Sequence, residues 1–167
     1  CVAPQFNSEQ RLRLRDARHP LLEEVLRRRN RGAGGVVPVS LELDREHRVM
    51  VLSGPNTGGK TVTLKTVGLL ALAAQAAIPV PAAEADLPLL EQVLADIGDY
   101  QSIQESLSTF SAHLTNIERM VEQVPAGAPA ASTLVLLDEL GAATDPQEGG
   151  ALAVAIVDHF LHSGALV

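Results

Sequence analysis

The stretch GPNTGGKT at residues 54–61 decides the fold that this chain is expected to adopt. It matches the pattern G-x-x-x-x-G-K-[ST], in which a glycine-rich turn between a strand and a helix surrounds phosphate oxygens with backbone N–H groups. Val49–Ser53 before it is β-branched and apolar, as in a strand, and Thr61–Ala77 after it is rich in Leu and Ala, as in a long buried helix. This order predicts a P-loop nucleotide-binding domain of the α/β class.

The residues of this loop have separate physical roles. The glycines let the backbone turn its N–H groups inward at the positive end of a helix. Lys60 is expected to place its charge at the β- and γ-phosphates of ATP, and Thr61 to offer its hydroxyl to Mg²⁺. A glycine-rich turn that only precedes a helix is the structural alternative. The predicted nucleotide-binding residues are Gly54, Pro55, Asn56, Thr57, Gly58, Gly59, Lys60 and Thr61.

A second motif follows the most apolar strand pattern in the chain. Leu134–Leu137 reads as a strand buried on both faces, and Asp138 and Glu139 come directly after it, at the edge where ligands bind in open α/β sheets. Asp138 is expected to hold Mg²⁺ through its water shell, and Glu139 to polarise the water that attacks the γ-phosphate. A strand that merely ends in two solvated acids is the alternative.

Three weaker signals lie elsewhere. The segment SLSTFS at residues 106–111 opens a helix with good N-cap residues; simple capping explains it, although such a helix end also binds phosphate. Gln101, in a polar stretch before that helix, is a candidate for coupling Mg²⁺ and the attacking water to a neighbouring domain. His159 and His162 are spaced for two metal ligands, but no third ligand accompanies them, so solvated helix positions are expected.

Strands and helices alternate along the chain, which predicts an α/β sheet with parallel central strands, flanking helices and a small antiparallel N-terminal β portion. Asp44–His47 reads as a polar turn. The further expected elements are a helix at Leu21–Arg29, extended segments at Val36–Val39 and Leu41–Leu43, a strand at Gln92–Ile97, a helix at Thr109–Gln123, a strand at Thr133–Leu137 and a helix from Pro146 to about His162.

Charge divides the chain into two expected parts. Residues 1–31 carry eight arginines and four carboxylates, whereas residues 32–167 carry three arginines, two lysines and sixteen carboxylates. We therefore expect a basic lead-in at 1–35, made of a helix and a glycine-rich loop, followed by the P-loop domain at 36–167. The acidic body argues against a broad duplex-binding face on this chain. Aromatic residues make up only 2%, which argues against base-stacking platforms.

Length and composition exclude several other classes of protein. The 167 residues are 46% hydrophobic, which suits one folded domain and excludes overall disorder. No apolar run reaches the ~18 residues of a membrane helix, and the single cysteine excludes an internal disulfide framework. A cytoplasmic protein is therefore expected. The chain begins without Met and stops just as an apolar segment starts after Gly164, so we expect a domain that is incomplete at its C-terminus.

Together these motifs resemble the ATPase core of the MutS family, a branch of the ABC-type ATPases. The Pro-Asn after the first loop glycine, the Ser-Thr-Phe at 108–110 and the Asp-Glu-Leu-Gly at 138–141 are all similar to that family's motifs. Arg18-His19-Pro20 matches a further landmark. The run from Asp96 to Leu114 and the segment GAATDP at 141–146 resemble the second bacterial paralogue, the MutS-two branch. The resemblance covers nearly the whole chain.

The resemblance implies a head-to-tail homodimer with two composite ATP sites. Each site would use the phosphate loop and the Asp138–Glu139 pair of one chain, while the partner would supply Ser108 and Thr109 of the signature and Asp145 of an interface loop. The family couples ATP turnover to clamp movement on branched or distorted DNA. The MutS-two branch is linked to DNA repair, suppression of recombination, an appended nuclease domain and, in some members, ribosomes and their rRNA.

The chain also departs from the family pattern. The family's switch histidine would lie beyond the strand that starts near Ala165, and Val36 or Val37 stands near the position where relatives often stack an aromatic residue on adenine. The first expectation is a Mg²⁺-dependent ATPase domain, with Glu139, Lys60 and Gln101 as catalytic residues. A dimerisation module that binds ATP but scarcely hydrolyses it is the alternative. A transporter-type ABC subunit is disfavoured, because residues 108–110 replace the expected Leu-Ser-Gly-Gly-Gln run.

Overall fold

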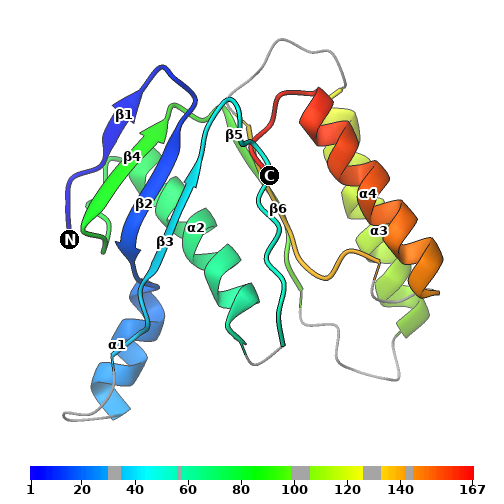
Figure 1. Ribbon diagram of the computed structural model, residues 1–167. Coiled ribbons are helices and arrows are strands. Elements are labelled where there is room, and N and C mark those ends of the chain that lie inside the picture. The colour runs from blue at the N-terminus through cyan, green and yellow to red at the C-terminus, as the bar shows by residue number, and fades with distance from the viewer. Residues whose placement is uncertain (30–34, 56–57, 99–105, 126–132, 142–144) are drawn as a thin grey trace. The chain divides into compact units, whose positions relative to one another are not determined.

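The computed structural model describes residues 1–29, 35–55, 58–98, 106–125, 133–141 and 145–167 (Figure 1). These residues form two compact units, Cys1–Leu90 and Glu91–Val167, and each unit is described here by itself. The expected grouping into a lead-in of residues 1–35 and an ATPase domain of residues 36–167 stays a prediction. Within the described chain, no helix is both long and apolar enough to cross a membrane.

A four-stranded sheet in the order β1-β4-β2-β3 dominates the first unit (Figure 1). Strand β2 runs antiparallel to both β3 and β4, whereas β1 runs parallel to β4. Alternate residues of the sheet are buried, such as Leu12 and Leu14 of β2, and this alternation supplies its core face. The sheet is the expected N-terminal β portion, with mixed rather than purely antiparallel pairing. The strands are β1 Gln5–Asn7, β2 Leu12–Ala17, β3 Val39–Leu43 and β4 Glu84–Pro88.

Two helices complete the first unit. Helix α1 (Pro20–Arg29) has no buried residue, and its Glu24 carboxylate accepts from the guanidinium groups of Arg27 and Arg28. Helix α2 (Lys60–Gln75) buries a face that includes Leu70. The end of α2 is joined to the end of β4, because the Gln75 amide donates to the backbone oxygen of Pro88 (3.2 Å). Both helices lie within two residues of their predicted ranges.

The predicted strand at Val49–Ser53 is wrong in the structure described here. The segment has no strand assignment, and Val51 is 80% exposed. An apolar, β-branched pattern favours an extended chain, but a strand also needs a neighbour that pairs with its N–H and C=O groups. None of the four strands of the first-unit sheet pairs with this segment. The polar turn expected before it is confirmed, because the Asp44 carboxylate accepts from the backbone N–H groups of Glu46 (2.8 Å) and His47 (2.6 Å).

The second unit contains the expected parallel pairing. Strands β5 (Gln92–Asp96) and β6 (Thr133–Leu137) are parallel along their whole length, with Asp96 opposite Leu137. A parallel bridge then joins Leu134 to Leu166. Helices α3 (Ser106–Gln123) and α4 (Pro146–His162) complete the unit. Parallel strands with helices in the connections agree with the predicted class for this part of the chain.

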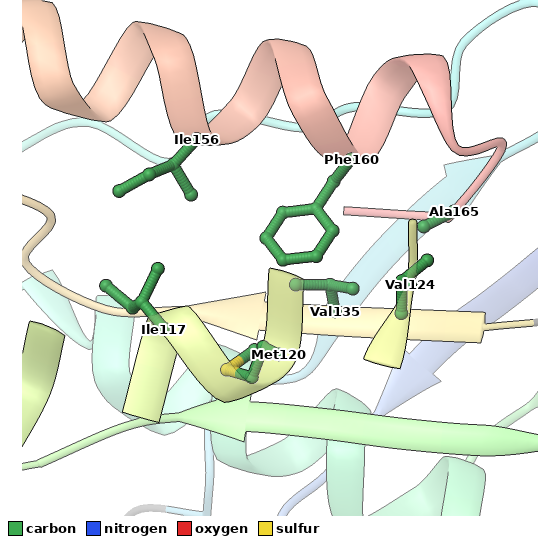
Figure 2. Packing of buried hydrophobic residues seen from close by; sticks show 7 residues of the cluster. All are labelled: Ile117, Met120, Val124, Val135, Ile156, Phe160 and Ala165. Atoms are coloured by element: carbon green, nitrogen blue, oxygen red, sulfur yellow. The ribbon is translucent and has the colours of Figure 1, made fainter. Parts of the chain in front are cut away.

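The core of the second unit is an apolar cluster between α3, α4 and β6 (Figure 2). The ring of Phe160, fully buried, points from α4 toward Val135 of β6. Burying one aromatic side chain of this size contributes on the order of 3 kcal/mol. Among the described side chains of α3, its buried members are Ile117 and Met120, in the second half of the helix. Its members are Ile117, Met120, Val124, Val135, Ile156, Phe160 and Ala165.

Candidate functional site

The described part of the phosphate loop has the backbone that glycine permits. Gly54 and Gly59 have positive φ angles of 142° and 79°, which L side chains rarely adopt. Gly59 is the N-cap of α2 and supplies no side-chain hydrogen bond to the first turn. The helix therefore begins with backbone N–H groups that its cap residue does not satisfy, which is the arrangement that binds phosphate. Asn56 and Thr57 lie outside the described residues.

The side chain of Lys60 contacts the first residue of this loop. Its Nζ donates a hydrogen bond to the backbone oxygen of Gly54 (2.5 Å), so the ammonium group is held beside the loop that precedes its own helix. A second turn hydrogen bond joins Gly58 N to Pro55 O (2.9 Å). Thr61 is half-buried in the first turn of α2. The structure thus places Lys60 against Gly54, with Thr61 next along α2, and the roles of these residues toward nucleotide and Mg²⁺ stay predictions.

The second unit places Asp138 and Glu139 directly beyond β6, as expected. Asp138 is buried, with 5% of its surface exposed, whereas Glu139 is exposed and has a φ of 50°. The left-handed conformation at Glu139 turns the chain sharply at the strand end. Two successive acids therefore occupy different environments, one at the sheet edge and one in solvent.

Asp145 has a definite structural role at the start of α4. Its carboxylate accepts from the backbone N–H of Gln147 (2.9 Å) and of Glu148 (3.5 Å), which makes it the N-cap. Gly141 and Gly149 approach so closely that a Cβ added to either would overlap the backbone of the other. Gly141, at the end of the turn after β6, therefore lies directly against the first turn of α4.

Ser108 and Thr109 belong to the first turn of α3, a helix that begins three residues earlier than its predicted start at Thr109. Gln101 lies outside the described residues. A cluster that the sequence interpretation missed lies one turn further along α3: the buried Asp96 carboxylate, at the end of β5, faces Nδ1 of His113. The Asp96 side chain also accepts from the Asn116 amide (2.8 Å). The sequence signal that could have identified this cluster is the spacing of His113 and Asn116, three residues apart on one helix that follows a strand ending in Asp96.

The two histidines of α4 contact different backbone oxygens. His159 Nε2 lies 2.8 Å from the backbone oxygen of Val124, and His162 Nδ1 lies 2.8 Å from that of Asp158. Among the described residues, no group of three or more His, Cys, Asp or Glu side chains is arranged to hold a metal ion. A Mg²⁺ at a phosphate loop needs no such cluster, because one or two side chains hold it together with nucleotide phosphates.

Comparison with known proteins places the chain in a family. The sequence pattern described as MutS domain V matches residues 50–166. The chain belongs to the MutS family. MutS domain V is the ATPase domain of that family, and the match begins four residues before the phosphate loop and runs past α4.

Several relatives that match over most of this chain carry the name Endonuclease MutS2. The Thermomicrobium roseum protein is 51% identical over 166 residues, which is 99% of this chain and 19% of the relative. The Brevibacillus brevis protein is 46% identical over the same shares, and the Synechocystis protein 47% over 90% of this chain and 20% of its own. These matches support the predicted MutS-two branch. The chain spans about a fifth of the length of these relatives.

Proposed function

We propose that this chain binds ATP and Mg²⁺ and hydrolyses ATP as the ATPase domain of a MutS-two-type protein. The observation that carries the proposal is the loop geometry of the first unit, where an uncapped helix start and the ammonium of Lys60 converge on the same turn. Both features stabilise negative charge, because helix N–H groups and an ammonium attract phosphate oxygens. The MutS domain V match makes ATP the expected nucleotide.

The residues also suit a magnesium ion by their chemistry. Mg²⁺ prefers hard oxygen ligands and keeps several of its waters, so one hydroxyl and one carboxylate suffice beside phosphate oxygens. Thr61 and Asp138 are the oxygen donors that we assign to it. When bound, the ion supplies neutralisation of the charge on the transferring phosphoryl group.

In the proposed reaction, water forms a bond to the γ-phosphorus while the bond to the oxygen that bridges the β- and γ-phosphates breaks. Lys60 binds the β- and γ-phosphates and stabilises their charge. Glu139 orients the attacking water, and its exposed position suits contact with solvent. Gln101 is proposed to relay the state of this site to a neighbouring domain.

We propose that the active form is a head-to-tail homodimer. Ser108, Thr109 and Asp145 of one copy would then complete the ATP site of the other. In the intact protein, ATP turnover would move a clamp on branched or distorted DNA, with ribosome binding and a nuclease domain as further properties of the MutS-two branch. The relatives named Endonuclease MutS2 support this assignment of the whole protein.

The decisive experiment measures steady-state ATP turnover by the intact protein as its concentration is varied, with and without branched DNA. We expect the specific activity to rise with protein concentration, because half of each site comes from the partner. Tight ATP binding and ATP-dependent dimerisation without turnover would instead favour the alternative of a nucleotide-gated dimerisation module. Failure to bind ATP would contradict both functions.

A further inference from the structure

A group of three polar residues is buried beside the otherwise apolar core of the second unit. Asp96 has 3% of its surface exposed and His113 has 8%, and Asn116 is half-buried between them. Burial of a carboxylate is costly unless hydrogen bonds and an opposing charge or dipole compensate for lost water. A cluster of this kind in so small a unit indicates a positional role in addition to stability.

Both oxygens of the Asp96 carboxylate are engaged by α3. Oδ2 faces Nδ1 of His113 in a close buried contact, and Oδ1 accepts from Nδ2 of Asn116 at 2.8 Å. A carboxylate oxygen and an imidazole nitrogen in contact need a proton between them, and we assign it to Nδ1 of His113. His113 and Asn116 lie on the same face of α3, because residues three apart are neighbours on a helix surface. The carboxylate therefore fixes both the rotation of α3 and its position along its axis.

Asp96 also contacts the end of β6 through its backbone. Its carbonyl oxygen accepts from the N–H of Asp138 at 2.9 Å. One residue thus joins two parts of the proposed ATPase machinery: its backbone holds the strand end that carries Asp138 and Glu139, and its side chain holds α3. The first turn of α3 contains Ser108 and Thr109, and Thr109 is one helical turn before His113.

The described contacts of the apolar core lie further along α3. Among the α3 side chains that the structure describes, Ile117 and Met120 are the buried members of this core, and both lie in the second half of the helix. Apolar packing is non-directional and leaves small rotations of a helix open, whereas a carboxylate bridged by two donors permits one arrangement. The half of α3 nearest the Ser-Thr-Phe segment is therefore anchored by polar contacts.

We infer that Asp96, His113 and Asn116, called here the polar latch, are positioning residues that hold the signature turn of α3 in register with the strand ends that carry Asp138. The inference rests on the proposed ATPase function. Since Asp138 and Glu139 would serve the chain's own site and Ser108 and Thr109 the partner's, the polar latch is a physical link between the two composite sites of a dimer. Its loss is expected to lower the rate of the chemical step and leave ATP binding by the phosphate loop unchanged.

The test compares four variants of the intact protein with wild type. His113→Leu removes the hydrogen-bond donor to Asp96. His113→Asn keeps a donor, because its amide nitrogen lies close to the position of Nδ1. Asn116→Ala removes the second donor but leaves His113 in place, so it is the milder change. His162→Leu is the control, because His162 is an exposed histidine of α4 outside the latch. Each kcat is normalised to the folded fraction measured by circular dichroism, and ATP affinity is measured by calorimetric titration.

We expect His113→Leu to lower kcat about 10- to 100-fold with an ATP dissociation constant within about twofold of wild type, since small misplacements of catalytic groups have effects of this size. His113→Asn is expected to restore most of the activity, and Asn116→Ala to lower kcat less than His113→Leu does. Hydrogen exchange is expected to be faster in the second and third turns of α3, whose N–H groups are hydrogen-bonded within the helix, and unchanged in α4. His162→Leu is expected to behave as wild type.

Two results would overturn the inference. One is a normalised kcat equal to that of wild type in both His113→Leu and Asn116→Ala, which would show that the polar latch contributes only to the stability of the fold. The other is equal loss in His113→Asn and His113→Leu. If His113→Leu does not fold, Asn116→Ala and His113→Asn decide between these results. Lys60→Ala, run in parallel, separates the two proposals: normal ATP binding and turnover in that variant would contradict the ATPase assignment itself.

Discussion

The backbone N–H of Asp138 donates to the carbonyl oxygen of Asp96 at 2.9 Å. Asp96 is the last residue of β5 and Asp138 directly follows β6, so this hydrogen bond joins the two parallel strands at the carboxyl edge of the second-unit sheet. This hydrogen bond extends the β5–β6 ladder by one residue beyond Leu137. It places the buried Asp138 next to a second buried acid, Asp96, whose side chain contacts His113 and Asn116 of α3. The carboxyl edge of this sheet is therefore joined to α3 by the side chain and to β6 by the backbone of the same residue.

Replacement of Lys60 tests the phosphate loop. We expect Lys60→Ala to weaken ATP binding by about 10- to 150-fold, because a charge-assisted contact contributes roughly 1.5–3 kcal/mol. Lys65→Ala is the matched control, since Lys65 is an exposed lysine on the same helix, and it is expected to bind as wild type does. Calorimetric titration of both variants measures the difference. Equal affinities would contradict the assignment of Lys60.

Glu139→Gln tests the catalytic carboxylate. The amide keeps the shape of the side chain and removes the negative charge that orients water, so the loss should appear in kcat while ATP affinity stays within about twofold. The variant is expected to accumulate as an ATP-bound dimer, measured by light scattering. Glu122→Gln, at an exposed position near the end of α3, is the control. Turnover equal to wild type in Glu139→Gln would assign the role to another residue.

The contact between Gly141 and Gly149 predicts a sharp difference among alanine substitutions. Gly141→Ala and Gly149→Ala each place a methyl group against the backbone of the other residue, and Gly141 also has a φ of 76°. Overpacking of this kind costs about 1–3 kcal/mol.

Gly150→Ala is the control for these variants, because a Cβ there meets nothing within 4 Å. It is expected to raise stability by about 0.5–1 kcal/mol, since alanine favours a helix more than glycine does. Urea denaturation monitored by circular dichroism gives the three values. A loss at Gly150→Ala as large as at Gly149→Ala would contradict the close approach.

Phe160 tests the apolar cluster of Figure 2. Truncation of this fully buried ring in Phe160→Ala is expected to lower the free energy of unfolding by about 3–5 kcal/mol, the sum of lost burial and the cavity left behind. Val154→Ala on the same helix is the control, because Val154 is 70% exposed and its truncation is expected to change stability by less than about 0.5 kcal/mol. Both values come from chemical denaturation, and similar losses would contradict the packing described.

The turn after β3 predicts a pH dependence. The backbone N–H of His47, then that of Glu46, stabilises the ionised carboxylate and lowers the pKa of Asp44 below its ordinary value. A lowered pKa means that the stabilisation is complete above the unfolded-state pKa and is lost as pH falls through the folded-state pKa. We expect NMR to show that the Asp44 carboxyl titrates with a pKa below the ordinary value for aspartate. In Asp44→Asn this part of the acid-induced loss of stability should disappear, and an ordinary midpoint in wild type would contradict the turn.

Local signals predicted much of this structure. Strand β6 and helix α4 match their expected ranges, because a run of buried aliphatic residues and a Pro after an N-cap Asp are signals within a few adjacent residues. The glycine-rich loop was predicted for the same reason, since its pattern lies within eight residues. The MutS domain V match extends over residues 50–166 and confirms the family that these local motifs indicated.

The tertiary structure decided the features that need a distant partner. Strand β2 alternates leucine and arginine, so its apolar residues lie within a basic segment of the sequence. Its pairing with β3 and β4 is what identifies this segment as a strand. Val49–Ser53 shows the converse, since an apolar pattern without a pairing strand does not form one. The latch joins Asp96 to His113 and Asn116, 17 and 20 positions further along the chain, and the close approach of Gly141 to Gly149 also depends on the tertiary structure. The sequence alone predicted the elements and motifs that each segment carries, because propensity and motif are local. Only folding decided which polar groups face one another, because hydrogen bonds act over about 3 Å in space and not along the chain.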